Sequence, residues 1–178
     1  RRFSRGLDAG GLRSGGPAAG RGLLKWRLPN LRGSSKVTYA AITGWGKCMP
    51  PAVLTNADLA TFLDTTDEWI TSRTGIRERR VSHVRLEDLG YVAAMRALAC
   101  AGLDPADVEL IVFGTCSFDD QVPNQASGIQ VRLGAKKAAA MDVNTACTSF
   151  LYGLSTANAF IRNGVVRNAV VLGGEIIS

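Results

Sequence analysis

From residue 86 to residue 173 the sequence alternates two kinds of segment, and this alternation constrains the fold more than any other feature. Helical spacing of apolar residues predicts three helices, each followed closely by Gly: Leu86–Ala101, Gln125–Leu133 and Cys147–Arg162. Short apolar runs predict three buried strands: Glu109–Gly114, Ala138–Val143 and Asn168–Gly173. Strands that alternate with helices favour right-handed crossovers and a mainly parallel sheet with helices on both faces. The fold class is therefore α/β.

The part of the chain before residue 86 gives shorter and weaker signals. Val37–Gly46 predicts a strand that ends in a Gly-rich turn, and Ala57–Leu63 predicts a short helix capped by the preceding Asn56. Thr66 or the residue after it caps a further helix, and Arg73–Arg80 is expected to form a loop or hairpin. These elements extend the α/β domain toward its N-terminal side.

The formal net charge of +6 is concentrated at the start of the chain. Residues 1–36 hold nine Lys or Arg and one acid, which leaves 12 basic and 14 acidic residues for 37–178. We expect two parts: a disordered basic extension over 1–36 and a globular domain over 37–178. Because the globular part is slightly acidic, no nucleic-acid partner is expected. The extension resembles either an organelle transit peptide or an added segment without function.

The four cysteines argue against both a metal site and a disulfide framework. Cys48, Cys100, Cys116 and Cys147 are widely spaced, and His83 is the only histidine, in a polar stretch typical of the surface. No apolar run is long enough to span a membrane, so no membrane partner is expected. A reducing compartment follows: the cytoplasm, or an organelle stroma or matrix if residues 1–36 are a transit peptide.

Cys147 is the cysteine whose position suits catalysis. It lies in the segment DVNTACTSF, where a predicted strand runs into a predicted helix, and small residues surround it. A helix N-terminus favours negative charge, and a thiolate there can capture an acyl group covalently. The alternative is that Cys147 is a small core residue, which is the commoner role of a free cysteine.

A second group of residues suits a nucleotide. In the segment TTDEWITSRTGIRERR, Trp69 and Arg73 are four positions apart and share one face of the predicted helix. An indole ring beside a guanidinium can stack on an adenine and bind phosphates. The alternative is that Trp69 anchors the helix to the core while Arg73 is a solvated charge.

These two segments together resemble the beta-ketoacyl-acyl-carrier-protein synthase III family, which has the thiolase-like fold. DEWITSRTGIRERR resembles the signature of the family, and DVNTACTSFLYGL resembles its nucleophile segment. The preceding LTNADL and the Gly174–Glu175 pair fit in the same order. The resemblance runs from about Tyr39 to Ser178 and therefore covers the N-terminal half of a thiolase-like fold.

The resemblance implies a function and a set of site residues. The family joins an acyl-CoA to malonyl-acyl-carrier protein and so initiates fatty-acid synthesis, with acyl-CoA as a substrate and no cofactor or metal. By resemblance, Cys147 takes the acyl group, and Thr65, Trp69 and Arg73 hold the nucleotide of CoA. Val122 matches a position that lines the acyl pocket, where many members carry Phe, so a longer or branched primer is expected.

The resemblance also implies a homodimer, with the Ala138–Val143 strand edge as its expected interface. The second half of the family carries a His and an Asn that assist decarboxylation, and the sequence ends at Ser178 before them, so condensation is expected to need residues outside it. Two alternatives stay open. One is another thiolase-fold enzyme, such as a 3-hydroxy-3-methylglutaryl-CoA synthase or a condensing enzyme of secondary metabolism. The other is an inactive truncated fragment.

Overall fold

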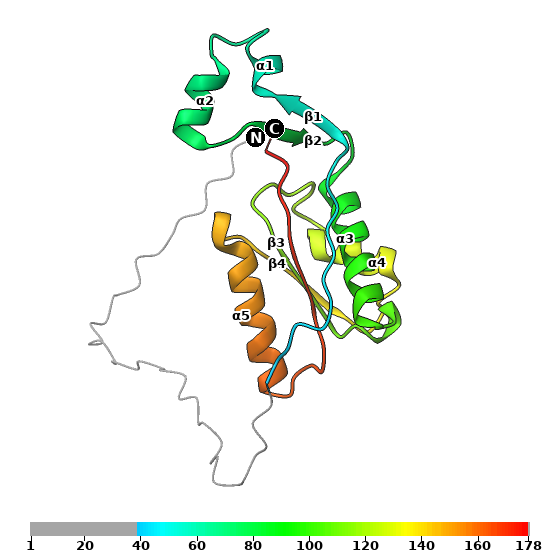
Figure 1. The fold of residues 1–178 in the computed structure, drawn as a ribbon. Coiled ribbons are helices and arrows are strands. Elements are labelled where there is room, and N and C mark those ends of the chain that lie inside the picture. The colour runs from blue at the N-terminus through cyan, green and yellow to red at the C-terminus, as the bar shows by residue number, and fades with distance from the viewer. Residues whose placement is uncertain (1–38, 178) are drawn as a thin grey trace, which may run out of the picture. The chain divides into compact units, whose positions relative to one another are not determined.

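A three-stranded parallel sheet forms the centre of the computed structural model, which describes residues 39–177 (Figure 1). Its strand order is β4 (Ala139–Val143), β3 (Leu110–Gly114), β5 (Val170–Gly173). Both pairings of β3 are parallel, and Gly114 at its end lies opposite Val143 on one side and Gly173 on the other. The predicted class, α/β with a parallel sheet, is confirmed.

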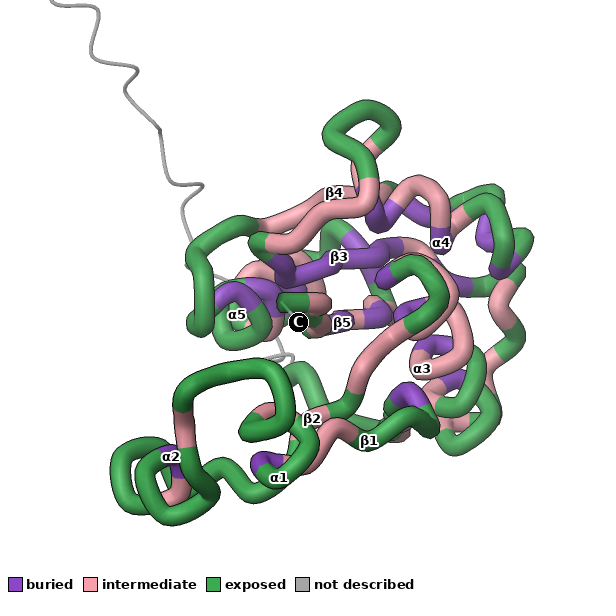
Figure 2. The backbone as a smooth tube through the Cα atoms, turned by 90° about the horizontal axis from the view of Figure 1, so that it is seen from above, coloured by how far each residue is buried: buried purple, intermediate pink, exposed green. Residues whose placement is uncertain are grey.

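Helices cover both faces of this sheet. One face packs against α3 (Leu86–Ala101) and α4 (Gln125–Leu133), and the other packs against α5 (Ser149–Arg162). All five residues of β3 are buried, which Figure 2 shows as a continuous purple strand. Because side chains alternate along a strand, Ile111 and Phe113 enter the α3–α4 core while Val112 enters the α5 core. A strand buried on both faces explains the continuous apolar run in the sequence.

The helix ends follow from local capping chemistry. Gly102 and Gly134 adopt the left-handed conformation, at φ of 64° and 69°, and end α3 and α4 at the predicted residues. The side chain of Asn124 accepts a hydrogen bond from the backbone N–H of Ser127 and caps the start of α4. Among these three helices one start differs from the prediction: α5 begins at Ser149, because Ala146–Thr148 forms a separate 3₁₀ turn, η2. A further 3₁₀ turn, η1 (Pro105–Asp107), precedes β3.

Residues 52–81 form a second substructure, which we call the β1–β2 excursion. Strands β1 (Ala52–Thr55) and β2 (Glu78–Val81) pair antiparallel, and α1 (Asn56–Leu59) and α2 (Asp67–Thr74) lie between them in the chain. The helix at Thr66 was predicted correctly, since Thr66 caps α2. Strand β1 was not predicted. Arg73–Arg80, expected to be a loop or hairpin, contains the end of α2 and most of β2, which pairs antiparallel with β1.

Asn56 has a different role from the predicted cap. The cap of α1 is Thr55, which exchanges hydrogen bonds with Asp58 in a capping box, and α1 is shorter than the expected Ala57–Leu63. Asn56 is only 1% exposed. Its amide donates to Asp67 Oδ1 at 2.7 Å and to the carbonyl of Ile76 at 2.8 Å, and its Oδ1 accepts from Arg79 at 3.1 Å. This one amide therefore ties α1, α2 and β2 together.

The strand predicted over Val37–Gly46 was wrong for the described part of that segment. Residues 39–50 contain no strand. Gly44 lies so close to α3 that a Cβ on it would be 2.4 Å from the carbonyl oxygen of Ala97. The segment thus lies against a helix, and no strand among residues 39–177 pairs with it. The predicted basic extension, 1–36, lies outside the described residues. Within residues 39–177, no helix is long and apolar enough to cross a membrane.

Candidate functional site

The carboxyl edge of the sheet brings three chain segments together. Since β3, β4 and β5 are parallel, the residues that follow each strand emerge at the same edge. These segments are Thr115–Ser117 after β3, Asn144–Thr148 after β4 and Gly174–Ile176 after β5. The backbone N–H of Thr115 donates to the carbonyl of Val143 at 3.1 Å, so the first two segments leave the sheet side by side. Ligand sites of open α/β sheets form at this edge.

Cys147 is presented on a tight turn at this edge. It is exposed and lies in η2, between the end of β4 and the start of α5. Ala146 before it has a φ of 51°, the one positive φ of a non-glycine residue within 39–177, which costs of order 1 kcal/mol or more. The turn is held by buried Ser149, whose Oγ accepts from the N–H of Thr145 at 2.9 Å and donates to the carbonyl of Ala146 at 2.7 Å.

The start of α5 leaves room for negative charge beside Cys147. Thr148 is the N-cap residue of α5, and its side chain makes no capping hydrogen bond. Its hydroxyl instead donates to the carbonyl of Thr145 at 2.7 Å. The positive end of the helix dipole is thus available to charge that develops on the Cys147 sulfur or on a carbonyl bound next to it. The predicted placement of Cys147 at a strand-to-helix junction is what the structure has.

Gly114 fixes how closely the turn approaches the sheet. A Cβ on Gly114 would lie 2.7 Å from the backbone carbon of Ser149 and 2.8 Å from the backbone nitrogen of Phe150. Both atoms belong to the main chain, so neither can rotate away. Any side chain at residue 114 would push the first turn of α5, and Cys147 with it, away from the edge of the sheet.

The second predicted group lies in the β1–β2 excursion. In α2 the guanidinium of Arg73 is 4.9 Å from the ring centroid of Trp69, as their spacing predicted. Trp69 is 55% exposed. Beside it is a hollow lined by Leu59, Leu63, Asp64, Thr65, Thr66, Trp69 and Ile70. Thr65 Oγ1 is buried there and has no hydrogen-bond partner among residues 39–177, which is unusual for a buried hydroxyl.

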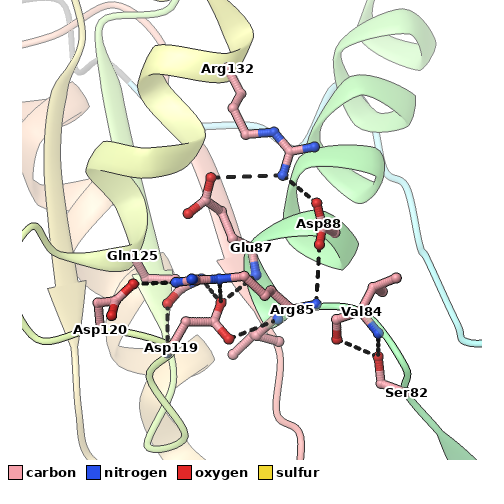
Figure 3. Close-up of polar contacts among 10 residues, drawn as sticks. Ser82, Val84, Arg85, Glu87, Asp88, Asp119, Asp120, Gln125 and Arg132 are labelled. Atoms are coloured by element: carbon pink, nitrogen blue, oxygen red, sulfur yellow. Dashed lines mark hydrogen bonds and ion pairs between the residues drawn. The ribbon is translucent and has the colours of Figure 1, made fainter.

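A polar network holds the loop that connects β3 with α4 (Figure 3). The Asp119 carboxylate accepts from the backbone N–H groups of Leu86 and Glu87, at 3.2 and 2.8 Å, and so caps α3. The side chain of Gln125 donates to the same carboxylate at 2.6 Å, and Arg85 pairs with it and with Asp120. Burial raises the pKa of Asp119, but hydrogen bonds from Gln125, Glu87 and Leu86 outweigh it and lower the pKa below its usual value.

Val122 lies in this loop and is 89% exposed. None of the described residues forms an enclosed apolar pocket around it. Asp142 of β4 accepts from the backbone N–H groups of Gln125 and Ala126, at 2.7 and 2.8 Å, and so fixes where α4 begins after the loop.

Of the predicted site residues, the structure places Cys147 at the same edge of the sheet as the segment after β3. It leaves Trp69, Arg73 and Thr65 together on the excursion.

Two residues at the sheet edge were not recognised as site candidates in the sequence. Glu175 appeared only as part of a Gly–Glu pair, and Cys116 only as one of four widely spaced cysteines. The structure joins them: the backbone N–H of Cys116 donates to Glu175 Oε1 at 2.9 Å. Their separation of 59 positions hides this contact from any local pattern. The signal that was available is that each follows a predicted buried strand of one parallel sheet.

Metal ligands do not gather at this edge. Among residues 39–177 no group of three or more His, Cys, Asp or Glu side chains is placed to hold a metal ion. His83 lies in the connection between β2 and α3, whereas Cys147 lies between β4 and α5. The groups at this edge are two thiols, hydroxyls, backbone N–H groups and the Glu175 carboxylate.

The fold and the Cys-bearing junction define a class, the thiolase-like condensing enzymes. A solved structure of 3-oxoacyl-[acyl-carrier-protein] synthase III from Aquifex aeolicus superposes with a TM-score of 0.75 and 40% identity, over 76% of this chain and 44% of that one. The priming beta-ketosynthase of a polyketide biosynthetic pathway superposes with a TM-score of 0.71 and 34% identity, over 78% of this chain and 42% of that one. The thiolase-like fold is therefore confirmed.

Sequence relatives identify the family within this class. Beta-ketoacyl-[acyl-carrier-protein] synthase III 2 of Vibrio cholerae is 56% identical over 140 residues, which cover 79% of this chain and 39% of that protein. Beta-ketoacyl-[acyl-carrier-protein] synthase III of Roseiflexus castenholzii is 44% identical over 142 residues, or 79% and 43% of the two chains. The family model 3-oxoacyl-[acyl-carrier-protein (ACP)] synthase III matches residues 141–178. The chain is a partial member of the beta-ketoacyl-acyl-carrier-protein synthase III family and matches its N-terminal part.

Proposed function

We propose that this chain supplies the acyl-accepting half of a beta-ketoacyl-acyl-carrier-protein synthase III active site. The chain spans about two fifths of the curated relatives it matches, 39% and 43% of their lengths, so the complete activity is part of the proposal. The observation that carries it is the position of Cys147: exposed, on a strained turn, at the start of a helix without a side-chain cap.

In the proposed first step, the sulfur of Cys147 attacks the thioester carbonyl of an acyl-CoA. The carbon–sulfur bond to CoA breaks, CoA leaves as a thiol, and the acyl group stays on Cys147. In the second step, malonyl-acyl-carrier protein loses carbon dioxide, and the resulting carbanion attacks the acyl-cysteine, which frees Cys147. Acyl-CoA and acyl-carrier protein are the proposed partners.

The nucleotide of CoA is proposed to bind on the excursion. The exposed ring of Trp69 offers a stacking surface for adenine, and the guanidinium of Arg73 next to it suits phosphate. The unpartnered hydroxyl of Thr65, in the hollow beside Trp69, can hydrogen-bond to a polar group of the ligand. A stacking surface, a cation and an unpartnered hydroxyl thus lie in one small part of the excursion, and together they support the proposal more than any of them does alone.

Val122 is proposed to set the length of the primer. Valine removes the volume of the Phe that many family members carry, so a longer or branched acyl chain fits. The comparison to make is Cys147 acylation by acyl-CoAs of increasing length, in the wild-type chain and in Val122→Phe. The proposal expects the variant to lose activity with longer primers and to keep it with acetyl-CoA. Strict acetyl preference in the wild type would refute it.

A homodimer is proposed to form through the outer edge of β4. In the described sheet β4 is an edge strand, and its outer backbone groups pair with no other strand of residues 39–177. A free strand edge of this kind invites pairing with a second copy. Sedimentation of the chain and of a variant with Pro in place of Ala140 tests this, because Pro removes a backbone donor from the edge.

Intact-protein mass spectrometry after mixing with acetyl-CoA tests the function. We expect a mass gain of one acetyl group in the wild type and in Cys100→Ala, which removes an exposed thiol from α3. Cys147→Ala should gain none. An adduct of equal yield on Cys147→Ala would show that the chain lacks the proposed nucleophile.

A further inference from the structure

The carboxylate of Glu175 accepts several hydrogen bonds at the sheet edge, and the proposed mechanism gives this residue no role. It follows β5 by two residues, and every donor to its carboxylate comes from the segment after β3. The backbone N–H of Cys116 donates to Oε1 at 2.9 Å. The hydroxyls of Thr115 and Ser117 donate to Oε2, at 3.1 and 2.5 Å. One carboxylate thus binds three consecutive residues.

A return contact locks the two segments together. The backbone N–H of Ile176, next to Glu175, donates to Ser117 Oγ at 2.9 Å. The N–H of Ser117 donates to the hydroxyl of Thr115, which is fully buried, at 3.1 Å. Glu175 is therefore held by groups that need an acceptor, and an apolar residue in its place would leave the buried hydroxyl of Thr115 without this partner.

The charge of Glu175 lies next to Cys116, whose backbone it binds and whose thiol is exposed. Burial raises the pKa of Glu175, but hydrogen bonds from Ser117, the Cys116 N–H and Thr115 outweigh it and lower the pKa. Glu175 is thus an anion at neutral pH. Loss of solvation, followed by the interaction with the Glu175 carboxylate, raises the pKa of Cys116 above its usual value.

The basic residues of the adjoining cavity make no ion pair with Glu175 among residues 39–177. Glu175 lines this cavity, of about 360 Å³, and the two basic residues in its wall are Lys47 and Arg80. Cys116 and Cys147 are both exposed at the same edge, yet the proposed reaction uses only one of them.

We propose that Glu175 is a positioning residue that decides which of these two thiols reacts. It holds Thr115–Ser117 in place and keeps Cys116 as a neutral thiol, so that the acyl group goes to Cys147 alone. The acyl part of this inference rests on the proposed function, whereas the effect on Cys116 does not. Without the carboxylate charge, Cys116 becomes a competing nucleophile, since the thiolate is the reactive form of cysteine.

Site-resolved alkylation of the purified chain with iodoacetamide tests the inference. Glu175→Gln keeps an acceptor for the Cys116 N–H and removes the charge, and its NH2 group stands where Oε2 accepts from Thr115 and Ser117. We expect Cys116 alkylation at neutral pH to rise about tenfold, which corresponds to a pKa lowered by about one unit on loss of one adjacent charge, and its pH midpoint to shift downward. Cys100 on α3 is the internal reference and should not change. Glu109→Gln is the matched control, because Glu109 precedes β3 and therefore lies at the opposite end of that strand.

The outcomes separate the two proposals. Faster Cys116 alkylation together with acetyl adducts on both thiols of Glu175→Gln supports the whole inference. If Cys116 is alkylated faster in Glu175→Gln but the wild type gains no acetyl adduct, the effect of Glu175 on Cys116 is supported and the proposed function is refuted. An unchanged pH profile of Cys116 in Glu175→Gln, at a melting temperature equal to that of the wild type, overturns the inference. If Glu175→Gln melts earlier, Glu175→Asp decides, since it retains the charge: Cys116 must stay slow in it, and fast alkylation would contradict the inference.

Discussion

The parallel sheet and the β1–β2 excursion are stabilised by different kinds of side chain. Around the sheet, apolar residues from α3, α4 and α5 bury β3 completely, as the purple segments of Figure 2 show. In the excursion, α2 buries one residue, Ile70, and the buried amide of Asn56 joins the elements through hydrogen bonds. The lesson is that the sheet can hold a strained turn at Cys147, whereas the excursion presents the exposed ring of Trp69, the proposed nucleotide surface, on a small polar support.

Replacing Phe113 with Ala should have the largest effect on stability. Phe113 is 1% exposed and sits in the α3–α4 core, so its loss is expected to cost about 3–5 kcal/mol of unfolding free energy. Phe62 in the excursion is 65% exposed, and Phe62→Ala should cost less than about 0.5 kcal/mol. Urea denaturation of both variants measures the difference. Equal losses would break the comparison between the two regions.

Replacing Asn56 with Ala should loosen the excursion and spare the sheet. The variant leaves the Ile76 carbonyl and Arg79 without their partner, at an expected cost of about 1–3 kcal/mol. Hydrogen exchange followed by mass spectrometry should show faster exchange in residues 52–81 and unchanged exchange in β3. Asn163→Ala, at the exposed end of α5, is the matched control. Faster exchange throughout the chain would mean that the excursion and the sheet unfold as one unit.

Replacing Trp69 with Ala should weaken acyl-CoA binding by about tenfold, because stacking of a base on an aromatic ring contributes roughly 1–3 kcal/mol. Stability should change little, since more than half of Trp69 is exposed. Trp45→Ala is the control, as Trp45 is also exposed, at 71%, and lies outside the excursion. Isothermal titration with CoA gives both affinities. If Trp45→Ala weakens CoA binding as much as Trp69→Ala does, the proposed nucleotide site on α2 is wrong.

Acidification should have the smallest effect and should act on both regions. Hydrogen bonds from the Thr55 side chain and backbone lower the pKa of Asp58 in the excursion. The pKa of Asp119, beside the sheet, is also below its usual value. A carboxylate with a lowered folded-state pKa contributes its full stability above its unfolded value, near 4, and loses it as the pH falls through the folded value. Thermal melts between about pH 6 and pH 2.5 should show a smaller acid-induced drop in Asp119→Asn than in the wild type. An equal drop would exclude Asp119 as a source of acid sensitivity.

The sequence predicted most of the sheet and its helices because their signals are local. Leu86–Ala101 and Gln125–Leu133 were predicted at the observed residues, since a Gly follows each helix and apolar spacing runs through it. Strand β1 was missed because four residues that pair only with β2 give no long apolar run. The segment before residue 47 was misassigned because its pattern suits a strand, while its packing against α3 depends on two glycines.

The residues of the candidate site also fall into two groups, those that a local pattern could identify and those that it could not. The strand-to-helix junction at Cys147 and the Trp69–Arg73 pair lie within short stretches, so spacing alone could find them. Glu175 could not be found in that manner, because its three donors lie 58 to 60 positions away. Asn56 has the appearance of a helix cap, and only the folded excursion reveals its buried amide as a junction. Contacts between distant segments are the part of a site that a sequence pattern does not contain.

The most direct measurement is the acetylation rate of Cys147 from two donors, acetyl-CoA and the short thioester S-acetyl-N-acetylcysteamine, followed by peptide mass spectrometry. If the sheet edge holds the nucleophile and the excursion binds the nucleotide, Trp69→Ala slows transfer from acetyl-CoA by about tenfold and leaves transfer from the short thioester unchanged. Cys147→Ala abolishes both. Equal slowing of the two donors by Trp69→Ala, or acetylation that persists in Cys147→Ala, would contradict the account.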